Sequence, residues 1–214
     1  MISSTRAIVL NNLRYGDSSL IVHLYTESMG RQTVFVKGAF SKKSQTRAAM
    51  FQPLHLLELD LHYRANRQMQ RISNVHIHRF QGIPYDPVKS CIALFIAEIL
   101  CKTLKEEEAN PDLFNFLHHA VQILDLNESG TANFHIVFLG HFSRYLGFYP
   151  ANEITSDTAW ALIFGTPFER LDSLQLNHHQ RNFLTEHLLN YYATHVENFG
   201  KMKSFAVLQN IFID

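Results

Sequence analysis

Histidine is the residue type in this sequence that first suggests a chemical role, with 13 copies among 214 residues. Two histidines can hold zinc when a helix spaces them four residues apart, or when a Cys-x-x-Cys pair completes the site. The adjacent pairs His118-His119 and His178-His179 point to different faces of a helix. His76 and His78 would share one strand face but have no evident third ligand. The pattern therefore predicts packed or solvated histidines, no metal site and no cofactor.

Local signatures of catalysis are also missing from the sequence. Gly-x-Ser-x-Gly, the P-loop and Gly-x-Gly-x-x-Gly do not occur. Glu106-Glu107-Glu108 are neighbours at a solvated helix end, which is not an arrangement of converging carboxylates for acid and base chemistry. We therefore predict that the chain is not an enzyme. A hydrolase that uses His and Asp from distant segments stays open as an alternative.

The clearest candidate for a binding site is a cationic segment at residues 37–47. It carries Lys37, Lys42, Lys43 and Arg47 together with Gly, Ser and Thr, and it contains no acidic residue. Lysine and arginine bind a phosphate backbone because they displace condensed counterions, and hydroxyl and backbone N–H groups add hydrogen bonds to phosphate. The segment predicts a flexible phosphate-binding loop, with an ordinary solvated loop as the alternative.

A second group of cations lies in the same part of the chain. The arginines that flank or begin its last predicted strand are Arg64, Arg67, Arg71 and Arg79, and the set is extended by Arg6, Arg14 and Arg31. Of these, Arg31, Arg64, Arg67 and Arg71 are predicted to assist in binding phosphate.

Aromatic side chains near these cations could stack on unpaired bases, which contributes about 1–3 kcal/mol per base. Phe35 and Phe51 are predicted to pack in a core instead. For Phe40 and Tyr63, stacking and core packing both stay open.

Charge divides the chain into two halves. Residues 1–80 carry 11 Lys and Arg against 4 Asp and Glu, a net charge of +7. Residues 81–214 carry 8 against 15, a net charge of −7. Such asymmetry is typical of a protein that contacts a polyanion through one part. The first half is therefore the predicted nucleic-acid-binding part, and the charge of the second half would discourage DNA from binding there.

Five segments of the first 80 residues are predicted to be strands, which would form the scaffold for these cations. Turn-prone residues separate them at short spacing, a pattern typical of an antiparallel sheet. A small closed barrel of five strands is usually an OB-fold. The expected strands are 6–10 with a turn or bulge at Asn11-Asn12, then 19–25, 32–37, 54–63 and 69–78.

Pro84 and Pro87 mark a boundary, after which the hydrophobic spacing becomes helical. Asn110 is predicted to cap a helix that has Pro111 at its first position. The expected helices cover about 92–104, 111–124, 131–146, 177–195 and a short segment from 204, with an irregular segment at about 150–177. The predicted fold class is therefore α+β, with a five-stranded OB-fold barrel over residues 1–80 and an α-helical C-terminal domain over residues 81–214.

The two cysteines, Cys91 and Cys101, are too few for a disulfide framework. Both fall in an apolar helical stretch and are predicted to be small core residues. No secretory signal is recognisable, and the longest apolar run, residues 92–96, is far shorter than the roughly 20 residues that span a membrane. These features predict a cytoplasmic protein with no membrane partner.

Several short motifs stand in an order and spacing that is more specific than any of them alone. In the predicted barrel they are Ala7-Ile8-Val9-Leu10, Tyr15-Gly16-Asp17-Ser18-Ser19-Leu20, Gly30-Arg31, Lys37-Gly38-Ala39, Ser41-Lys42-Lys43-Ser44 and Gln52-Pro53-Leu54. In the predicted helices they are Ala97-Glu98-Ile99-Leu100, Leu113-Phe114, Leu146-Gly147-Phe148-Tyr149-Pro150, Leu188-Leu189-Asn190-Tyr191-Tyr192 and Lys203-Ser204. Together they resemble the RecO family of bacterial recombination mediator proteins over essentially the whole chain.

The resemblance implies binding of single- and double-stranded DNA, annealing of complementary strands and cooperation with RecR. It also implies binding to the acidic and hydrophobic tail of single-stranded DNA-binding protein, so that recombinase is loaded onto gapped DNA at the bacterial nucleoid. Such a tail needs a basic residue beside an apolar groove, for which Arg144 and Lys203 are the candidates.

The sequence departs from the family at one place. Many members carry a four-cysteine zinc site just after the Gly-Phe-x-Pro turn, but residues 152–172 contain no cysteine. We therefore predict that this segment binds no zinc and is held by apolar packing. The candidate packing residues are Trp160, Leu162, Phe164 and Phe168.

The expected mechanism is electrostatic. The cations of the barrel would neutralise phosphates on two strands and lower their mutual repulsion, so that complementary bases pair without chemistry from the protein. The alternative is an adaptor whose basic barrel meets an acidic partner protein instead of DNA.

Overall fold

The structure is a computed structural model that describes residues 1–40, 45–149 and 158–211. The chain forms two compact units. The first consists of Met1–Phe80 with Ile96–His119, and the second of Gln81–Phe95 with Ala120–Asp214. Helices α2 (Pro87–Thr103) and α3 (Pro111–Leu126) contribute residues to both units. The domain boundary at residues 80–81 stays a prediction.

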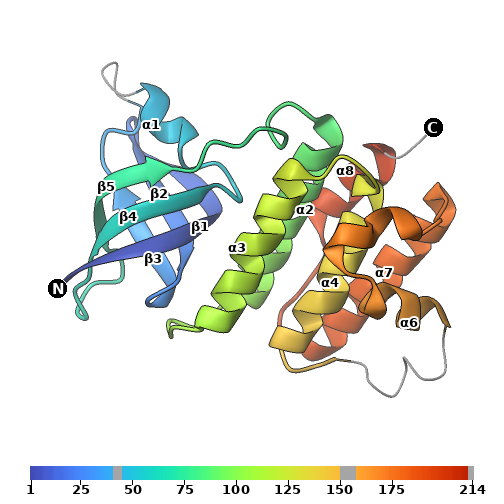
Figure 1. Cartoon of the computed structure of the whole chain (residues 1–214). Coiled ribbons are helices and arrows are strands. Elements are labelled where there is room, and N and C mark those ends of the chain that lie inside the picture. Colours follow the sequence, from blue (N-terminus) through green and yellow to red (C-terminus); the bar gives the residue numbers. More distant parts are fainter. Residues whose placement is uncertain (41–44, 150–157, 212–214) are drawn as a thin grey trace. The chain divides into compact units, whose positions relative to one another are not determined.

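The five predicted strands are present and form one antiparallel sheet, which confirms the predicted fold class. Across the sheet their order is β3-β2-β1-β4-β5 (Figure 1). The two outer strands meet at Gln70, which precedes β5 and forms a parallel bridge with Val34 of β3. The Phe35 N–H donates to the Gln70 carbonyl at 3.0 Å, and the Gln70 N–H donates to the Thr33 carbonyl at 2.8 Å. The strands are β1 (Ile2–Tyr15), β2 (Ser19–Thr26), β3 (Gly30–Val36), β4 (Leu56–His62) and β5 (Arg71–Ile77).

Strand β1 is longer than predicted, and a bulge divides the part that pairs mainly with β4 from the part that pairs with β2. Its pairing with β2 shifts register between Val9 and Asn11, close to the predicted turn or bulge at Asn11-Asn12. A bulge bends a strand and increases its twist. The first half of β1 therefore pairs with β4, and the second half pairs with β2.

The barrel core follows from alternating burial along the strands. In β3 every second residue is buried, as period-two side chains require. Phe51, which follows the short helix α1 (Gln45–Ala49), is fully buried in the same core. The expectation of core packing for Phe51 is confirmed.

Helices α2 and α3 begin with proline, which is favoured at a first helical position. The side-chain oxygen of Asn110 accepts from the Leu113 N–H at 3.0 Å, so the predicted cap is confirmed. Cys91 and Cys101 of α2 are only partly buried, which makes the prediction of core cysteines wrong in degree.

The second unit is built around α4 (Phe134–Tyr145), which is buried on nearly every side. Three phenylalanines follow one another along it, with the rings of Phe134 and Phe138 6.4 Å apart and those of Phe138 and Phe142 5.4 Å apart. A helix that is apolar all round belongs in the middle of a bundle. Helix α4 contacts the 3-10 turn η1 (Thr131–Asn133), α6 (Thr158–Gly165), the 3-10 helix η2 (Phe168–Ser173) and α7 (His178–His195). Helix α8 (Lys203–Ile211) follows them in the chain.

The end of α4 lies where the sequence predicts it. Gly147 has a φ of +81°, a left-handed conformation that costs glycine little. The Phe148 N–H donates to the Ser143 carbonyl and the Gly147 N–H donates to the Arg144 carbonyl. This pair of bonds is a Schellman motif, which satisfies the last carbonyls of a helix.

The prediction that residues 150–177 are irregular is wrong in part. Helix α6 and the 3-10 helix η2 both lie within this segment, whereas residues 150–157 lie outside the described residues. Both elements are short, so hydrophobic periodicity gave no clear signal for them.

Apolar packing holds the described part of this segment. The rings of Trp160 and Phe164 stack 5.4 Å apart, and those of Phe168 and Phe134 stack 4.9 Å apart. The predicted packing is therefore confirmed for Trp160, Phe164 and Phe168. It is wrong for Leu162, whose exposed fraction is 59%.

The burial of the His135 side chain in α4 indicates that the protein loses stability in acid. The side chain is 2% exposed, and its Nε2 lies 2.9 Å from the Thr185 hydroxyl. Burial, with a smaller effect of the Arg181 cation, lowers the pKa of His135 to about 3. Below pH 6.5 the unfolded chain binds a proton at this site that the folded protein does not bind. Stability that is present above pH 6.5 is therefore lost towards pH 3, at up to about 1.4 kcal/mol per pH unit.

Urea unfolding of the wild type and of His135→Gln, at a series of pH values from 7 down to 5, would measure this effect. We expect the variant to be less stable at pH 7 but to lose less stability on acidification. Equal slopes for the two proteins would contradict the role of His135.

Candidate nucleic-acid interface

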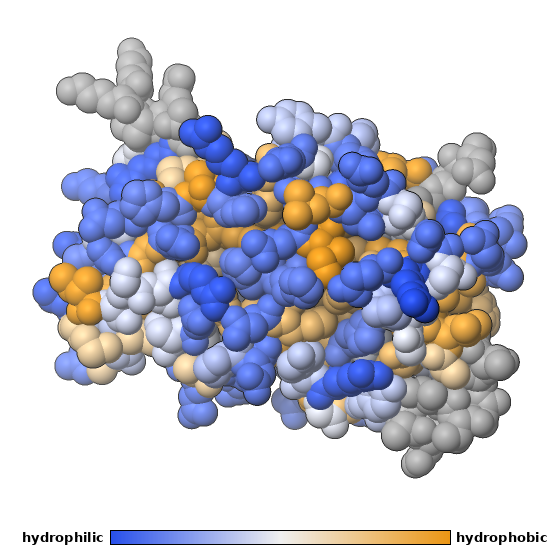
Figure 2. Space-filling model, in the orientation of Figure 1, coloured by the Kyte–Doolittle hydropathy of each residue, from blue (hydrophilic) through white to orange (hydrophobic). Residues whose placement is uncertain are grey.

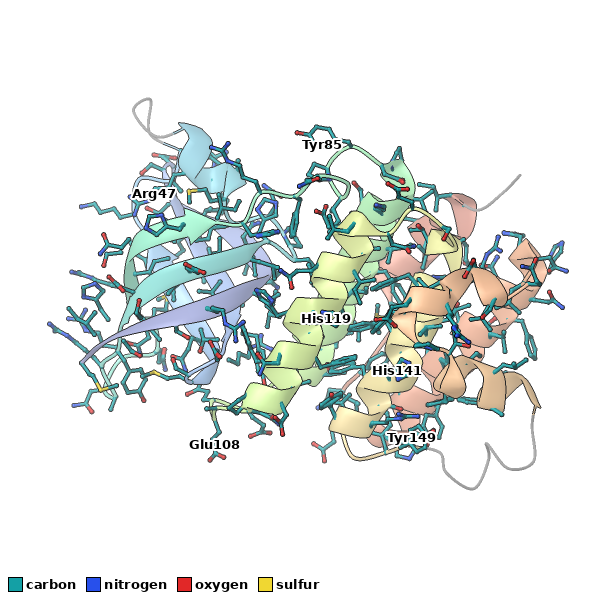
Figure 3. All side chains as sticks on the ribbon, in the orientation of Figure 1. Arg47, Tyr85, Glu108, His119, His141 and Tyr149 are labelled. Atoms are coloured by element: carbon teal, nitrogen blue, oxygen red, sulfur yellow. The ribbon has the colours of Figure 1, made fainter. Side chains whose placement is uncertain are left out.

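The cationic segment begins and ends on exposed side chains of the barrel. Lys37 follows β3 directly, and Arg47 belongs to α1 (Figure 3). Both lie at a pocket of about 300 Å³. Lys42 and Lys43 lie outside the described residues, so their contribution stays a prediction. The pocket is lined by Phe35, Val36, Lys37, Arg47, Arg71 and Ile72.

The second group of cations surrounds another pocket, of about 260 Å³. Arg64, Arg67 and Arg71 are exposed and line it, and Arg71 also lines the first pocket. The fold thus brings both predicted groups together around Arg71. We call the two pockets together the seam groove, because they share Arg71, which directly follows the residue that joins the start of β5 to β3. The second pocket is lined by Met1, Ile2, His62, Tyr63, Arg64, Arg67, Gln70 and Arg71.

A buried amide holds the turn between β4 and β5 in place. We call this turn, which carries Arg64 and Arg67, the arginine turn. The Gln70 side chain, from a residue that is only 4% exposed, accepts from the Arg64 N–H at 2.8 Å. Its amide nitrogen donates to the Arg64 carbonyl at 3.1 Å and to the Arg67 carbonyl at 2.8 Å. Because the backbone of Gln70 also closes the barrel, the turn that carries these arginines is fixed to the sheet. Sequence reasoning missed this role of Gln70.

The charged side chains in the lining of the seam groove are all positive. Within the described residues, no Asp or Glu lines either pocket and no ion pair engages its five cations. The barrel's ion pair lies elsewhere, between Arg6 and Glu27 at 2.6 Å. The hydrogen bond from Arg6 lowers the pKa of Glu27. Cations without an internal partner are available to an external anion.

Arg31 has a structural role that sequence reasoning missed. Its guanidinium donates to the carbonyls of Cys101 at 3.0 Å and Leu104 at 2.6 Å, at the end of α2. Its N–H donates to the Glu106 carbonyl at 2.8 Å. Gly30 has a φ of +59° and lies too close to the backbone of residues 106–108 to carry a side chain. Because its guanidinium already donates to these two carbonyls, fewer of its donors face an external phosphate, and a DNA contact by Arg31 stays a prediction.

Phe35 does not pack in the core, so that prediction is wrong. It lies on the outward face of β3, is half-buried, and meets the ring of Tyr15 edge-on at 5.9 Å. The alternation of β3 explains the error, because Val34 and Val36 take the inward positions. Phe35 is therefore accessible from the seam groove.

Tyr63 and Phe40, for which the sequence allowed either base stacking or core packing, lie at different places on the barrel. Tyr63 is half-buried and lines the seam groove. Phe40 is 42% exposed, and the Arg14 guanidinium lies 5.0 Å from the centre of its ring.

The two candidate partner-binding residues lie in the second unit. Arg144 donates to the Tyr149 hydroxyl at 2.9 Å and to the Phe164 carbonyl at 3.0 Å. Its guanidinium lies over the ring of Tyr149, which Figure 3 labels. Lys203 is exposed at the start of α8. Figure 2 shows only scattered hydrophobic patches among hydrophilic side chains on the face in view, and partner binding stays a prediction.

Two other classes of site, a metal centre and a membrane span, are not found in the described residues. In the described ranges, no three His, Cys, Asp or Glu side chains come together to hold a metal ion. No helix of that part of the chain has both the length and the hydropathy of a membrane span. The absence of zinc stays a prediction, because residues 150–157 lie outside the described part.

Comparison with known families gives two matches that together cover most of the chain. The family model described as "Recombination protein O N terminal" matches residues 1–80. The model described as "Recombination protein O C terminal" matches residues 84–153. The first match contains the whole lining of the seam groove.

Curated relatives match the chain over nearly its full length. The DNA repair protein RecO of Bacteroides fragilis is 35% identical, over 99% of this chain and all of the relative. The protein of the same name from Flavobacterium psychrophilum is 36% identical, over 97% of this chain and 98% of the relative. That from Porphyromonas gingivalis is 28% identical, over 99% of this chain and all of the relative.

Proposed function

The chain belongs to the RecO family of DNA repair proteins, and from that premise we propose that its barrel binds single- and double-stranded DNA through the seam groove. The observation that carries this proposal is the gathering of four other exposed cations around Arg71, with no carboxylate among the described lining residues. Lys42 and Lys43, which belong to the same cationic segment, are proposed to add phosphate contacts. Binding of this kind depends on phosphate and not on sequence.

The proposed activity is annealing of complementary strands without catalysis. Two DNA strands repel each other through their phosphates, and cations that bind both strands lower that repulsion. Bases that are held close together can then pair. The protein contributes position and charge, and no bond in DNA is made or broken.

The proposed setting is the loading of recombinase onto DNA that is coated with single-stranded DNA-binding protein. We propose RecR and the tail of single-stranded DNA-binding protein as partners, and the bacterial cytoplasm at the nucleoid as the location. Arg144 and Lys203 are the proposed contacts for the acidic tail. Support for these partners comes from the family. Residues 81–214 carry a net charge of −7, so an acidic tail would bind there only beside local cations such as Arg144 and Lys203.

The double variant Lys42→Glu with Lys43→Glu tests the cationic segment. We expect weaker binding to every oligonucleotide, a smaller dependence of affinity on salt, and slower annealing of two labelled complementary strands. The matched control is Arg170→Glu with Lys201→Glu, which makes the same change in net charge at exposed positions outside the barrel. Unchanged affinity and unchanged salt dependence in the first variant would remove this segment from the proposed site.

A barrel that binds an acidic protein instead of DNA is the competing function. It predicts no binding to unrelated oligonucleotides even at low salt. An absence of such binding would overturn the proposed DNA contacts, and the family membership would still stand.

A further inference from the structure

Each pocket of the seam groove combines cations with one partly exposed aromatic ring. Tyr63 lies with Arg64 and Arg67 in one pocket, and Phe35 lies with Lys37 and Arg47 in the other. Arg71 belongs to both pockets. The groove therefore repeats the same pair of features, a ring and a set of phosphate-binding groups, on the two sides of one arginine.

The backbone that carries each of the two rings is fixed to the barrel. The backbone of Tyr63 pairs with Met1, since its N–H donates to the Met1 carbonyl at 2.9 Å. Phe35 is joined through its N–H to Gln70, whose side chain holds the arginine turn. The backbone positions of Phe35, Tyr63 and the arginine turn are therefore preorganised, which lowers the entropic cost of ordering the site when a ligand binds.

This combination fits an unpaired strand better than a duplex. In a duplex the faces of the bases are covered by their neighbours, so the protein meets mainly phosphate and sugar. An unpaired strand offers the face of each base for stacking, and every base has such a face. Pockets of about 260 and 300 Å³ lie near the lower end of the size of small-molecule sites, which suits single nucleotides.

We propose that the seam groove is a site for unpaired single-stranded DNA, in which Tyr63 and Phe35 stack on bases while the surrounding cations bind the flanking phosphates. The inference rests on the proposed function and deepens it, because it names the strand form that this site prefers. Base stacking adds affinity that does not depend on salt, whereas the cations supply the part that salt weakens.

The test uses three labelled probes of equal length: a single strand, the matching duplex, and a strand of abasic sites that keeps the phosphates and lacks bases. We expect the wild type to bind the ordinary strand more tightly than the abasic strand, by about fivefold or more for each stacked base. In Phe35→Leu with Tyr63→Leu this preference should disappear. Affinity for the duplex and for the abasic strand, and the salt dependence of both, should stay as in the wild type.

The matched control is Phe40→Leu, which removes an exposed ring of the same barrel outside the groove. Retained duplex binding shows that the double variant is folded, and Tyr63→Leu alone provides a milder change. If the double variant keeps the preference for bases, or loses affinity for all three probes equally, the stacking site is overturned while DNA binding stands. If the wild type binds none of the probes, the proposed function itself fails.

Discussion

Arg71→Glu is expected to weaken binding to every oligonucleotide by about 10- to 100-fold. Arg71 is the only residue that lines both pockets of the seam groove, so among the described residues its reversal disturbs the most phosphate contacts. A hydrogen bond to a charged group contributes about 1.5–3 kcal/mol, which corresponds to that range of affinity. The introduced carboxylate also repels phosphate, because the neighbouring cations are exposed and cannot fully neutralise it.

Anisotropy of labelled single and double strands at several salt concentrations would measure the effect. Each phosphate contact that is lost should lower the slope of log K against log salt by about 0.9 on a duplex and about 0.7 on a single strand. The control is Arg79→Glu, an exposed arginine of the same unit that lines neither pocket. If Arg71→Glu and Arg79→Glu weaken binding equally, the barrel binds DNA through diffuse charge, and the seam groove is not the site.

Asp125→Ala is expected to lower the free energy of unfolding by about 3–5 kcal/mol. Asp125 of α3 is 3% exposed, and its carboxylate accepts 2.8 Å hydrogen bonds from the N–H groups of Gln81, Gly82 and Ile83. Removing the carboxylate leaves these donors without a partner, and an unsatisfied buried group costs about 1–3 kcal/mol. The ammonium of Lys89, which is 7% exposed, donates to the Asp125 carbonyl at 2.7 Å and holds the same corner.

Urea unfolding followed by circular dichroism would measure this loss. Asp125→Asn should cost less, because one oxygen can still accept from Gly82 and Ile83 while its amide faces the Gln81 N–H. Asp172→Ala, at an exposed position, serves as the control and should change stability by less than about 1 kcal/mol. A loss below about 1 kcal/mol in Asp125→Ala would show that water or backbone movement replaces the carboxylate.

Features that depend on local sequence were predicted well. Alternation located the strands of the barrel, Asn110 marked the start of α3, and Gly147 marked the end of α4. The motifs also identified the family, which the family models and the curated relatives confirm. Turn, cap and strand signals lie within a few residues of the feature they specify, so a single sequence contains them.

Features that depend on distant residues were not predicted. Arg31 looked like one more cation of the basic half, but its partners are carbonyls at the end of α2, some 70 positions further along the chain. Gln70 carries no charge and belongs to no motif, yet it closes the barrel and fixes the arginine turn. The error at Phe35 is one of register, because a single-residue shift places a strand residue on the opposite face.

The most direct test of DNA binding by the barrel is the affinity of the wild type for a labelled single-stranded oligonucleotide over a range of salt concentrations. We predict binding to unrelated sequences, with log K falling linearly in log salt and a slope that reflects several phosphate contacts. No binding at low salt, or an affinity that does not change with salt, would contradict the proposed function. Either result would favour an acidic protein, in place of DNA, as the partner of the positively charged barrel.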